Sequence, residues 1–191
     1  MTRQTDNSNE ALKLTVRQWL AEQFDTWRVL DLYCGKNGRM YRGIWSQAED
    51  YFGVDKYTPH QLAPTARMSA ERASQQLDLD RYNLFDVDCY SSPWIVARTI
   101  LHRRGPGKLG LTMTNGEDRG LKNGHANEII RRSIGANGLS DYRLLVRYRE
   151  LVIGLMLRSL GEIKGVQLLR AVKAETDRHI QYIGLIVEKT T

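Results

Sequence analysis

The chain has 191 residues, of which 41% are hydrophobic and 26% charged, and its formal net charge is +6. This composition is typical of globular proteins and excludes a disordered or fibrous chain. No stretch approaches the roughly 20 apolar residues that a membrane-spanning helix needs, and residues 1–9 are polar, so we expect no membrane contact and a cytoplasmic location. The length suits one domain over residues 1–191, with a helix within 1–27 and a core at 28–188.

The two cysteines, Cys34 and Cys89, are too few for a disulfide framework and have no ligand partners at metal-binding spacing. We therefore expect two reduced, packed thiols and no metal site. The positive charge favours an anionic partner, because Lys and Arg gain affinity by releasing counterions from a phosphate backbone. Nucleic acid is the partner that this charge suggests, whereas the oligomeric state has no signal in the sequence.

Helical and strand-like patterns alternate along the chain, and Gly-rich or polar turns separate them. Apolar spacing of three and four predicts helices, and short apolar runs predict buried strands. The predicted elements are, in order, helix 8–24, strand 28–33, helix 40–49, strand 51–55, strand 65–69, helix 70–77, strand 82–88, helix 93–102, strand 108–114, an exposed loop 115–124, helix 139–160, and a hairpin of strands 166–172 and 179–187.

Alternating strands and helices imply a parallel sheet, since parallel neighbours need a crossover of a dozen or more residues. Only the last two predicted strands are close enough in sequence to pair as an antiparallel hairpin. We therefore expect an α/β fold of three layers, in which helices cover both faces of a mostly parallel, seven-stranded sheet that a C-terminal antiparallel hairpin completes.

The turn after the first strand carries the first candidate site. Asp31 lies near the strand end, and Gly35 and Gly38 follow it, where glycine lets the backbone approach a ligand and adopt a positive φ. Asp55 ends the second strand about 20 residues beyond, where a carboxylate accepts hydrogen bonds from ribose hydroxyls. The alternatives are an ordinary strand-to-helix turn and a solvated acid beside Lys56.

A nicotinamide dinucleotide would use a similar turn and a similar acid. Its fingerprint of three glycines fails here, because Asn37 and Met40 occupy the second and third glycine positions counted from Gly35. The turn therefore does not favour a nicotinamide dinucleotide.

The segment at 86–94 combines two acids, Asp86 and Asp88, with Tyr90, Pro93 and Trp94. A conjugated exocyclic amine is a poor nucleophile, so a site that alkylates it must orient its lone pair and accept hydrogen bonds from its N–H groups. Carboxylates do this, and an aromatic ring can stack on a base. The alternative is that the acids only cap the helix that begins near the proline.

The order of elements and both segments resemble the class I, Rossmann-like S-adenosylmethionine-dependent methyltransferases over nearly the whole chain. Residues 86–94 resemble the fourth motif of amino-group methyltransferases, in the Asp-Leu-Asp-Pro-Phe-Gly-Ser-Pro form of the tRNA guanine-N2 methyltransferases. Cys89 replaces the proline and Ser91 the glycine, and Asn37 stands where a glycine is frequent in the first motif.

This resemblance implies a Rossmann-like sandwich, S-adenosylmethionine as cofactor, and methyl transfer to an exocyclic amine of a nucleic-acid base, RNA ahead of DNA. A protein or small-molecule acceptor and a non-catalytic binding protein are the alternatives. The resemblance implies catalytic roles for Asp88 and Tyr90. The implied cofactor contacts are Asp31, Tyr33, Gly35, Gly38, Asp55, Lys56, Ala70 and Asp86, and the implied acceptor contacts are Cys89, Trp94, Arg119 and Lys122.

Overall fold

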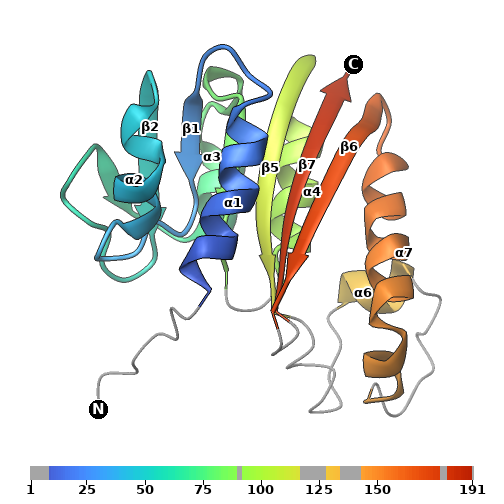
Figure 1. Ribbon diagram of the computed structural model, residues 1–191. Coiled ribbons are helices and arrows are strands. Elements are labelled where there is room, and N and C mark those ends of the chain that lie inside the picture. The colour runs from blue at the N-terminus through green and yellow to red at the C-terminus, as the bar shows by residue number, and fades with distance from the viewer. Residues whose placement is uncertain (1–8, 90–91, 117–127, 134–142, 177–179, 191) are drawn as a thin grey trace.

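A computed structural model describes residues 9–89, 92–116, 128–133, 143–176 and 180–190. Seven strands form one sheet in the order β3-β2-β1-β4-β5-β7-β6 (Figure 1). The strands are β1 (Arg28–Asp31), β2 (Asp50–Asp55), β3 (Thr65–Arg67), β4 (Leu84–Val87), β5 (Gly107–Asn115), β6 (Val166–Glu175) and β7 (Gln181–Lys189). The first five are parallel to one another, and β7 lies antiparallel between β5 and β6.

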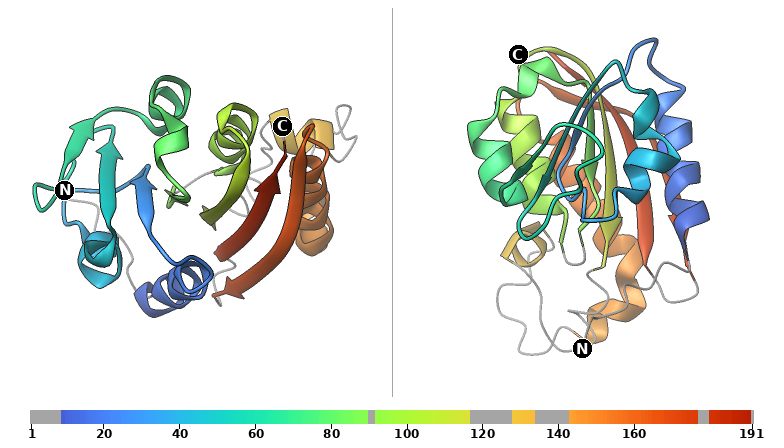
Figure 2. Two further views of the ribbon diagram at one scale, coloured as in Figure 1. Left: turned by 90° about the horizontal axis from the view of Figure 1, so that it is seen from above. Right: turned by 90° about the vertical axis from the view of Figure 1, so that its left-hand side faces the viewer.

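Helices lie on both faces of the sheet (Figure 2). One face carries α1 and α2, and the other carries α3, α4 and α7. The helices and 3-10 turns are α1 (Glu10–Ala21), α2 (Arg39–Gly43), η1 (Trp45–Gln47), α3 (Ala70–Gln76), η2 (Leu79–Arg81), α4 (Trp94–Arg103), α6 (Glu128–Ser133), η3 (Arg143–Tyr148) and α7 (Arg149–Gly161). No helix in the described ranges is long and apolar enough to cross a membrane.

The core lies on both faces of the sheet. Successive strand residues point to opposite faces, and a sheet covered on both sides therefore needs continuous apolar strands. Leu84 of β4 packs in the cluster with Leu20 of α1 and Trp45, whereas its neighbour Phe85 packs in the cluster of α3, α4 and α7. The burial of every residue of β4 follows from this arrangement.

The structure confirms the expected fold class, the mostly parallel sheet, the strand near 65 and the C-terminal hairpin. The helix expected over 40–49 is shorter. The backbone leaves the helical region at Ile44, whose φ is −151°, and a 3-10 turn then carries Trp45 into the core. Of the helix expected over 139–160, the described part is η3 followed by α7, and the short helix α6 was not expected.

Candidate functional site

The candidate residues gather at the edge of the sheet where the parallel strands end. The strand register places Asp31 of β1 between Gly53 of β2 and Asp86 of β4. The first turn of α1 lies at the same edge, at the bottom of Figure 1. Open α/β sheets bind ligands at this edge, where the loops leave the strands. The fold therefore brings the predicted first and fourth motifs together.

The glycine turn shows two different uses of glycine. Gly35 and Gly38 both have positive φ, of 59° and 53°. A Cβ on Gly38 would lie 2.8 Å from Cγ of His60, so this glycine is required by packing. Among the described residues, a Cβ on Gly35 would meet only the carbonyl oxygen of Tyr33, at 4.0 Å, so these residues leave the space above Gly35 open. A ligand can therefore lie against the backbone at Gly35, as the cofactor requires.

Asp55 is held in one orientation at the end of β2. Its Oδ1 accepts hydrogen bonds from the backbone N–H groups of Tyr57 (2.8 Å) and Thr58 (3.0 Å). Its Oδ2 has no hydrogen-bond partner in the part of the chain that the structure describes, and the residue is half-exposed. The exposed Lys56 lies 5.5 Å from the ring centroid of Tyr57. An oriented carboxylate with one unused oxygen suits a ribose diol.

Asp31 lies in a buried hydrogen-bond chain that the sequence did not predict. The Tyr51 hydroxyl donates to its Oδ2 (3.1 Å) and lies 3.0 Å from Nε2 of His60. Nδ1 of His60 accepts the backbone N–H of Leu62, so the proton of the neutral imidazole is on Nε2 and points at Tyr51. Burial, and next the charge of Asp86, raise the pKa of Asp31 well above its usual value.

Tyr33 and Ala70 are two further expected cofactor contacts, and they differ in burial. The backbone N–H of Tyr33 donates to Oδ1 of Asp31 (3.2 Å). The phenol of Tyr33 is half-buried, and its pKa is raised first by burial and next by the charge of Cys89. Ala70 begins α3 and is 2% exposed, packed in the core. The Ala70 side chain therefore faces the core, and its expected cofactor contact stays a prediction.

Asp86 anchors α1 to the sheet. Both oxygens are occupied: Arg17 donates to each at 2.6 Å, Trp45 donates to Oδ2 at 2.7 Å, and Thr112 donates to Oδ1 at 3.0 Å. Its side chain is fully buried. Its carboxylate is therefore occupied by protein donors and buried, and the expected cofactor contact at Asp86 stays a prediction.

Asp88 lies two residues further along, at the open edge. Lys13 donates to both of its oxygens (2.8 and 2.7 Å), and Thr114 donates to Oδ1 (2.6 Å). Burial alone would raise the pKa of Asp88, but Arg17, Lys13 and these hydrogen bonds outweigh burial and lower the pKa below its usual value. Asp88 is therefore a charged carboxylate at neutral pH.

The acceptor contacts expected at Cys89 and Trp94 fall on buried side chains. Cys89 is 2% exposed, and its Sγ lies 3.6 Å from the carbonyl oxygen of Thr114. Trp94 is 1% exposed and packs in the core, so no base can stack on its ring. Neither cysteine is in a disulfide and both are buried, and burial raises the pKa of Cys34 to about 12.

Three expected site residues, Tyr90, Arg119 and Lys122, lie outside the described residues. Within the described residues, no group of three His, Cys, Asp or Glu side chains could hold a metal ion.

Sequence reasoning missed the cations that face the two acids. Lys13 and Arg17 are four residues apart, on the face of α1 that also buries Val16 and Leu20. Two cations within an apolar helix stripe signal buried acidic partners, because buried charges are normally paired. His60 carried no such signal, since it lies in the connection between β2 and β3, which has no periodic pattern.

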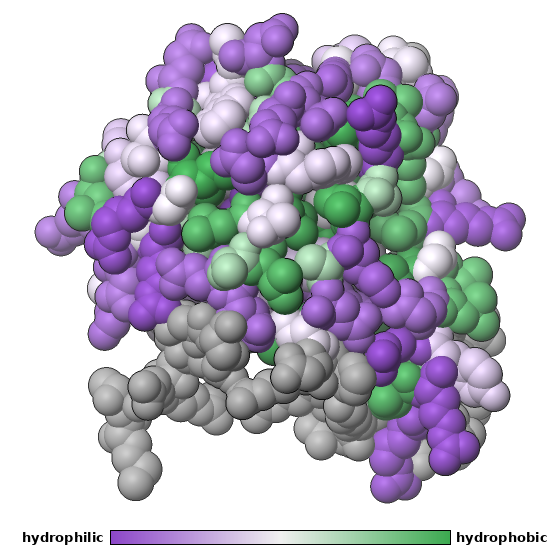
Figure 3. Space-filling view, in the orientation of Figure 1, coloured by the Kyte–Doolittle hydropathy of each residue, from purple (hydrophilic) through white to green (hydrophobic). Residues whose placement is uncertain are grey.

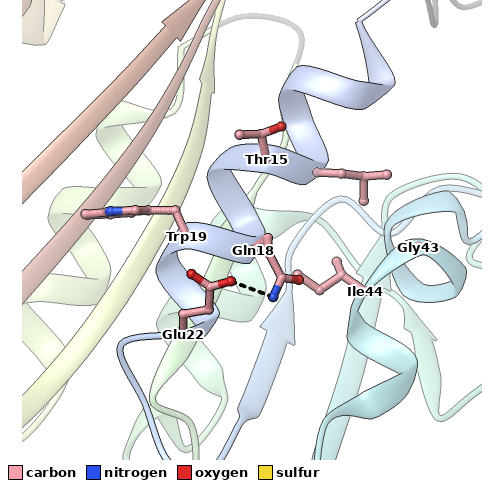
Figure 4. Close-up of a pocket in the computed structure, with 7 residues that line it drawn as sticks. Thr15, Gln18, Trp19, Glu22, Gly43 and Ile44 are labelled. Carbon is pink, nitrogen blue, oxygen red and sulfur yellow. Dashed lines mark hydrogen bonds between the residues drawn. The ribbon is translucent and has the colours of Figure 1, made fainter.

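A groove of about 460 Å³ lies on the other side of α1, between α1 and α2. Leu14, Trp19 and Ile44 line it together with polar side chains, among which Gln18 donates to Glu22 (Figure 4). In the view of Figure 3, which has the orientation of Figure 1, hydrophobic residues gather over the middle of the visible face, with hydrophilic ones around them. None of the expected site residues lines this groove.

No protein-family model matches the sequence, and no curated protein matches it either. Solved structures do match in fold. The N-methyltransferase NodS from Bradyrhizobium japonicum, in complex with S-adenosylhomocysteine, has a TM-score of 0.57 and 11% identity and covers 100% of this chain and 92% of its own. Magnesium protoporphyrin IX methyltransferase (ChlM) from Synechocystis, with bound S-adenosylmethionine, has a TM-score of 0.54 and 12% identity over 96% of this chain and 82% of its own. A candidate hemolysin from Lactococcus lactis has a TM-score of 0.61 and 10% identity over 100% and 90%.

The chain therefore has the Rossmann-like fold of the class I methyltransferases. At these identities the likeness concerns the fold alone. None of the three descriptions names RNA, so the resemblance of residues 86–94 to the tRNA guanine-N2 methyltransferases gains no support from them.

Proposed function

We propose that the chain is an S-adenosylmethionine-dependent methyltransferase. The open backbone at Gly35 and the oriented, half-exposed carboxylate of Asp55 lie at the carboxyl edge of adjacent strands, and they suit the two ends of a nucleoside. Two solved structures of the same fold hold this cofactor or its demethylated product. The cofactor supplies an electrophilic methyl group on a positively charged sulfur.

The observation that carries the acceptor chemistry is the charged carboxylate of Asp88 at this edge. A nitrogen that is being alkylated gains positive charge, and a fixed carboxylate stabilises that charge where water is largely excluded. Because its pKa is lowered, Asp88 orients the acceptor and does not serve as the base. We therefore propose that the acceptor atom is an amine nitrogen held by Asp88.

A nucleic-acid base and a small amine are the two acceptor classes. The base is supported by the net charge of +6 and by Arg131 and Arg132 in α6, which lies at the same edge (Figure 1). The small amine is supported by one matched structure, which is described as an N-methyltransferase. The structure removes one argument for a base, because Trp94 is buried.

Calorimetry with S-adenosylmethionine and S-adenosylhomocysteine tests the cofactor. We expect both to bind the wild-type chain and the exposed-acid control Asp25→Ala, and we expect Asp55→Ala to bind both more weakly. No binding to the wild-type chain would rule the proposal out. Labelled cofactor offered with RNA, DNA, protein and small-amine fractions then identifies the acceptor class. Binding without turnover on every fraction would indicate a non-catalytic protein.

A further inference from the structure

The side chain of Lys13 occupies the position that an acceptor amine would take. Its Nζ donates to both oxygens of Asp88 and lies 5.7 Å from the ring centroid of Tyr182. The Thr114 hydroxyl fixes the same carboxylate through Oδ1. A carboxylate beside an aromatic face is how proteins bind organic ammonium groups. The side chains around Asp88 therefore suit an ammonium ion, and Lys13 supplies one.

The geometry explains why two cations pair with two acids here. Lys13 and Arg17 are one helical turn apart, about 6 Å along α1. Asp86 and Asp88 are two strand residues apart, about 6.6 Å along the chain direction of β4. Because the pairs are Lys13 with Asp88 and Arg17 with Asp86, the helix runs against the strand and both pairs form at once.

The charges of this cluster balance only while a cation sits at Asp88. Arg17 makes its two short contacts with Asp86 and reaches Asp88 only at 3.5 Å. If Lys13 swings away, the two carboxylates share the single positive charge of Arg17 in a largely buried site. Leaving such a charge unpaired is costly, so a group that replaces Lys13 must itself carry a positive charge.

Lys13 can leave without disturbing the helix. Arg17 is 1% exposed and holds α1 on the sheet, and its Nη1 also donates to the backbone carbonyl of Lys13 (3.1 Å). The Lys13 side chain is 21% exposed, so its flexible four-carbon stem has a path to solvent. The backbone therefore stays in place while the ammonium group moves.

We infer that Lys13 is an intramolecular occupant of the acceptor subsite and that the acceptor is an aliphatic ammonium ion that displaces it from Asp88. This inference rests on the proposed function, in which Asp88 faces the acceptor. The bound ammonium must lose one proton to solvent before its nitrogen lone pair can attack. Asp88 holds the cation and stays ionised throughout.

The test is a binding measurement with n-butylammonium chloride, which reproduces the end of a lysine side chain. We titrate it into wild-type protein, Lys13→Met, Lys13→Gln, Lys13→Arg and the exposed-lysine control Lys164→Met, and follow binding by calorimetry. Removal of the internal competitor should tighten binding about tenfold in both neutral variants, which corresponds to about 1.4 kcal/mol. Lys13→Arg and Lys164→Met should bind as weakly as the wild type.

The neutral alcohol n-butanol is the matched ligand control, and circular dichroism establishes that each variant is folded. Equal affinity of the wild type and both neutral variants, or equal binding of the alcohol, would overturn the inference. This readout needs neither cofactor nor turnover, so it is separate from failure of the proposed function, which shows as absent cofactor binding. Either neutral variant is sufficient if the other does not fold.

Discussion

The guanidinium of Arg17 donates two hydrogen bonds of 2.6 Å to the carboxylate of Asp86, 69 residues away in sequence. Both side chains are almost completely buried. The pair therefore joins α1 to the centre of the sheet and sets where Lys13 meets Asp88.

The first prediction concerns the stability of this pair. Arg17→Met leaves the Asp86 charge buried without its cation, and we expect the free energy of unfolding to fall by about 3–5 kcal/mol. The exposed pair of Arg158 and Glu162 is the control, where Arg158→Met should cost less than about 1 kcal/mol. Urea unfolding measures both.

A second change separates lost packing from unpaired charge. Arg17→Met combined with Asp86→Leu removes both charges, and it should recover part of the stability that Arg17→Met alone loses. If the single variant loses no more stability than the Arg158 control, Arg17 does not anchor the helix.

The second prediction contrasts the two glycines of the turn. Gly38→Ala should destabilise the fold, because its φ is positive and its Cβ would lie 2.8 Å from His60 and 2.9 Å from Leu62. Gly35→Ala meets no such neighbour, so it should cost only about 1 kcal/mol for the left-handed backbone. Its main effect should be weaker binding of S-adenosylhomocysteine, measured by calorimetry. If Gly35→Ala destabilised the fold and left binding unchanged, no ligand would lie against Gly35.

Much of the fold was readable from local pattern, because each strand ends at a recognisable turn. The glycines at 35 and 38 and the break at 105–107 separate apolar runs of strand length, and the short link before 180 indicates a hairpin. The position of Asp55 at the end of a strand was predicted for the same reason, because local sequence is enough to place a strand end. The N-terminal helix, which apolar spacing predicted over 8–24, is observed over Glu10–Ala21.

The orientation of side chains in the fourth motif could not be read in this way. Residues 86 and 88 point to the same face of β4 by alternation, but which helix covers that face is decided by tertiary packing. Once α1 lies there, Asp86 meets Arg17 and is saturated, whereas Asp88 stays at the edge. Trp94 turns into the core for a similar reason, because α4 packs its first residue on the sheet.

The third prediction concerns pH. Burial, and next the charge of Arg42, lower the pKa of His60 in the folded state. The unfolded chain then binds more protons, so His60 makes stability fall as pH drops through about 6.5, down to its folded pKa. His60→Phe keeps a ring against Tyr41 and Tyr51 but cannot titrate.

We therefore expect the urea midpoint of the wild type to fall more steeply between about pH 7 and pH 5 than that of His60→Phe. Asp31 acts with the opposite sign, since its raised pKa makes protonation favour the folded state as pH falls. His102, whose pKa burial also lowers, acts with the same sign as His60. Both are present in both proteins, so the difference in slope reports His60, and equal slopes would show that His60 does not titrate.

The last prediction separates the two roles open to Asp88. Asp88→Asn keeps the size of the side chain and removes its charge, so it should lower turnover of the acceptor by about a hundredfold or more. Affinity for S-adenosylhomocysteine should not change, because the proposed cofactor contacts lie at Gly35 and Asp55. Calorimetry and a labelled-methyl assay on the same preparation give both quantities, with the exposed Asp25→Asn as control. If affinity and turnover fall together, Asp88 belongs to the cofactor site, and the amine that Lys13 imitates must be held elsewhere.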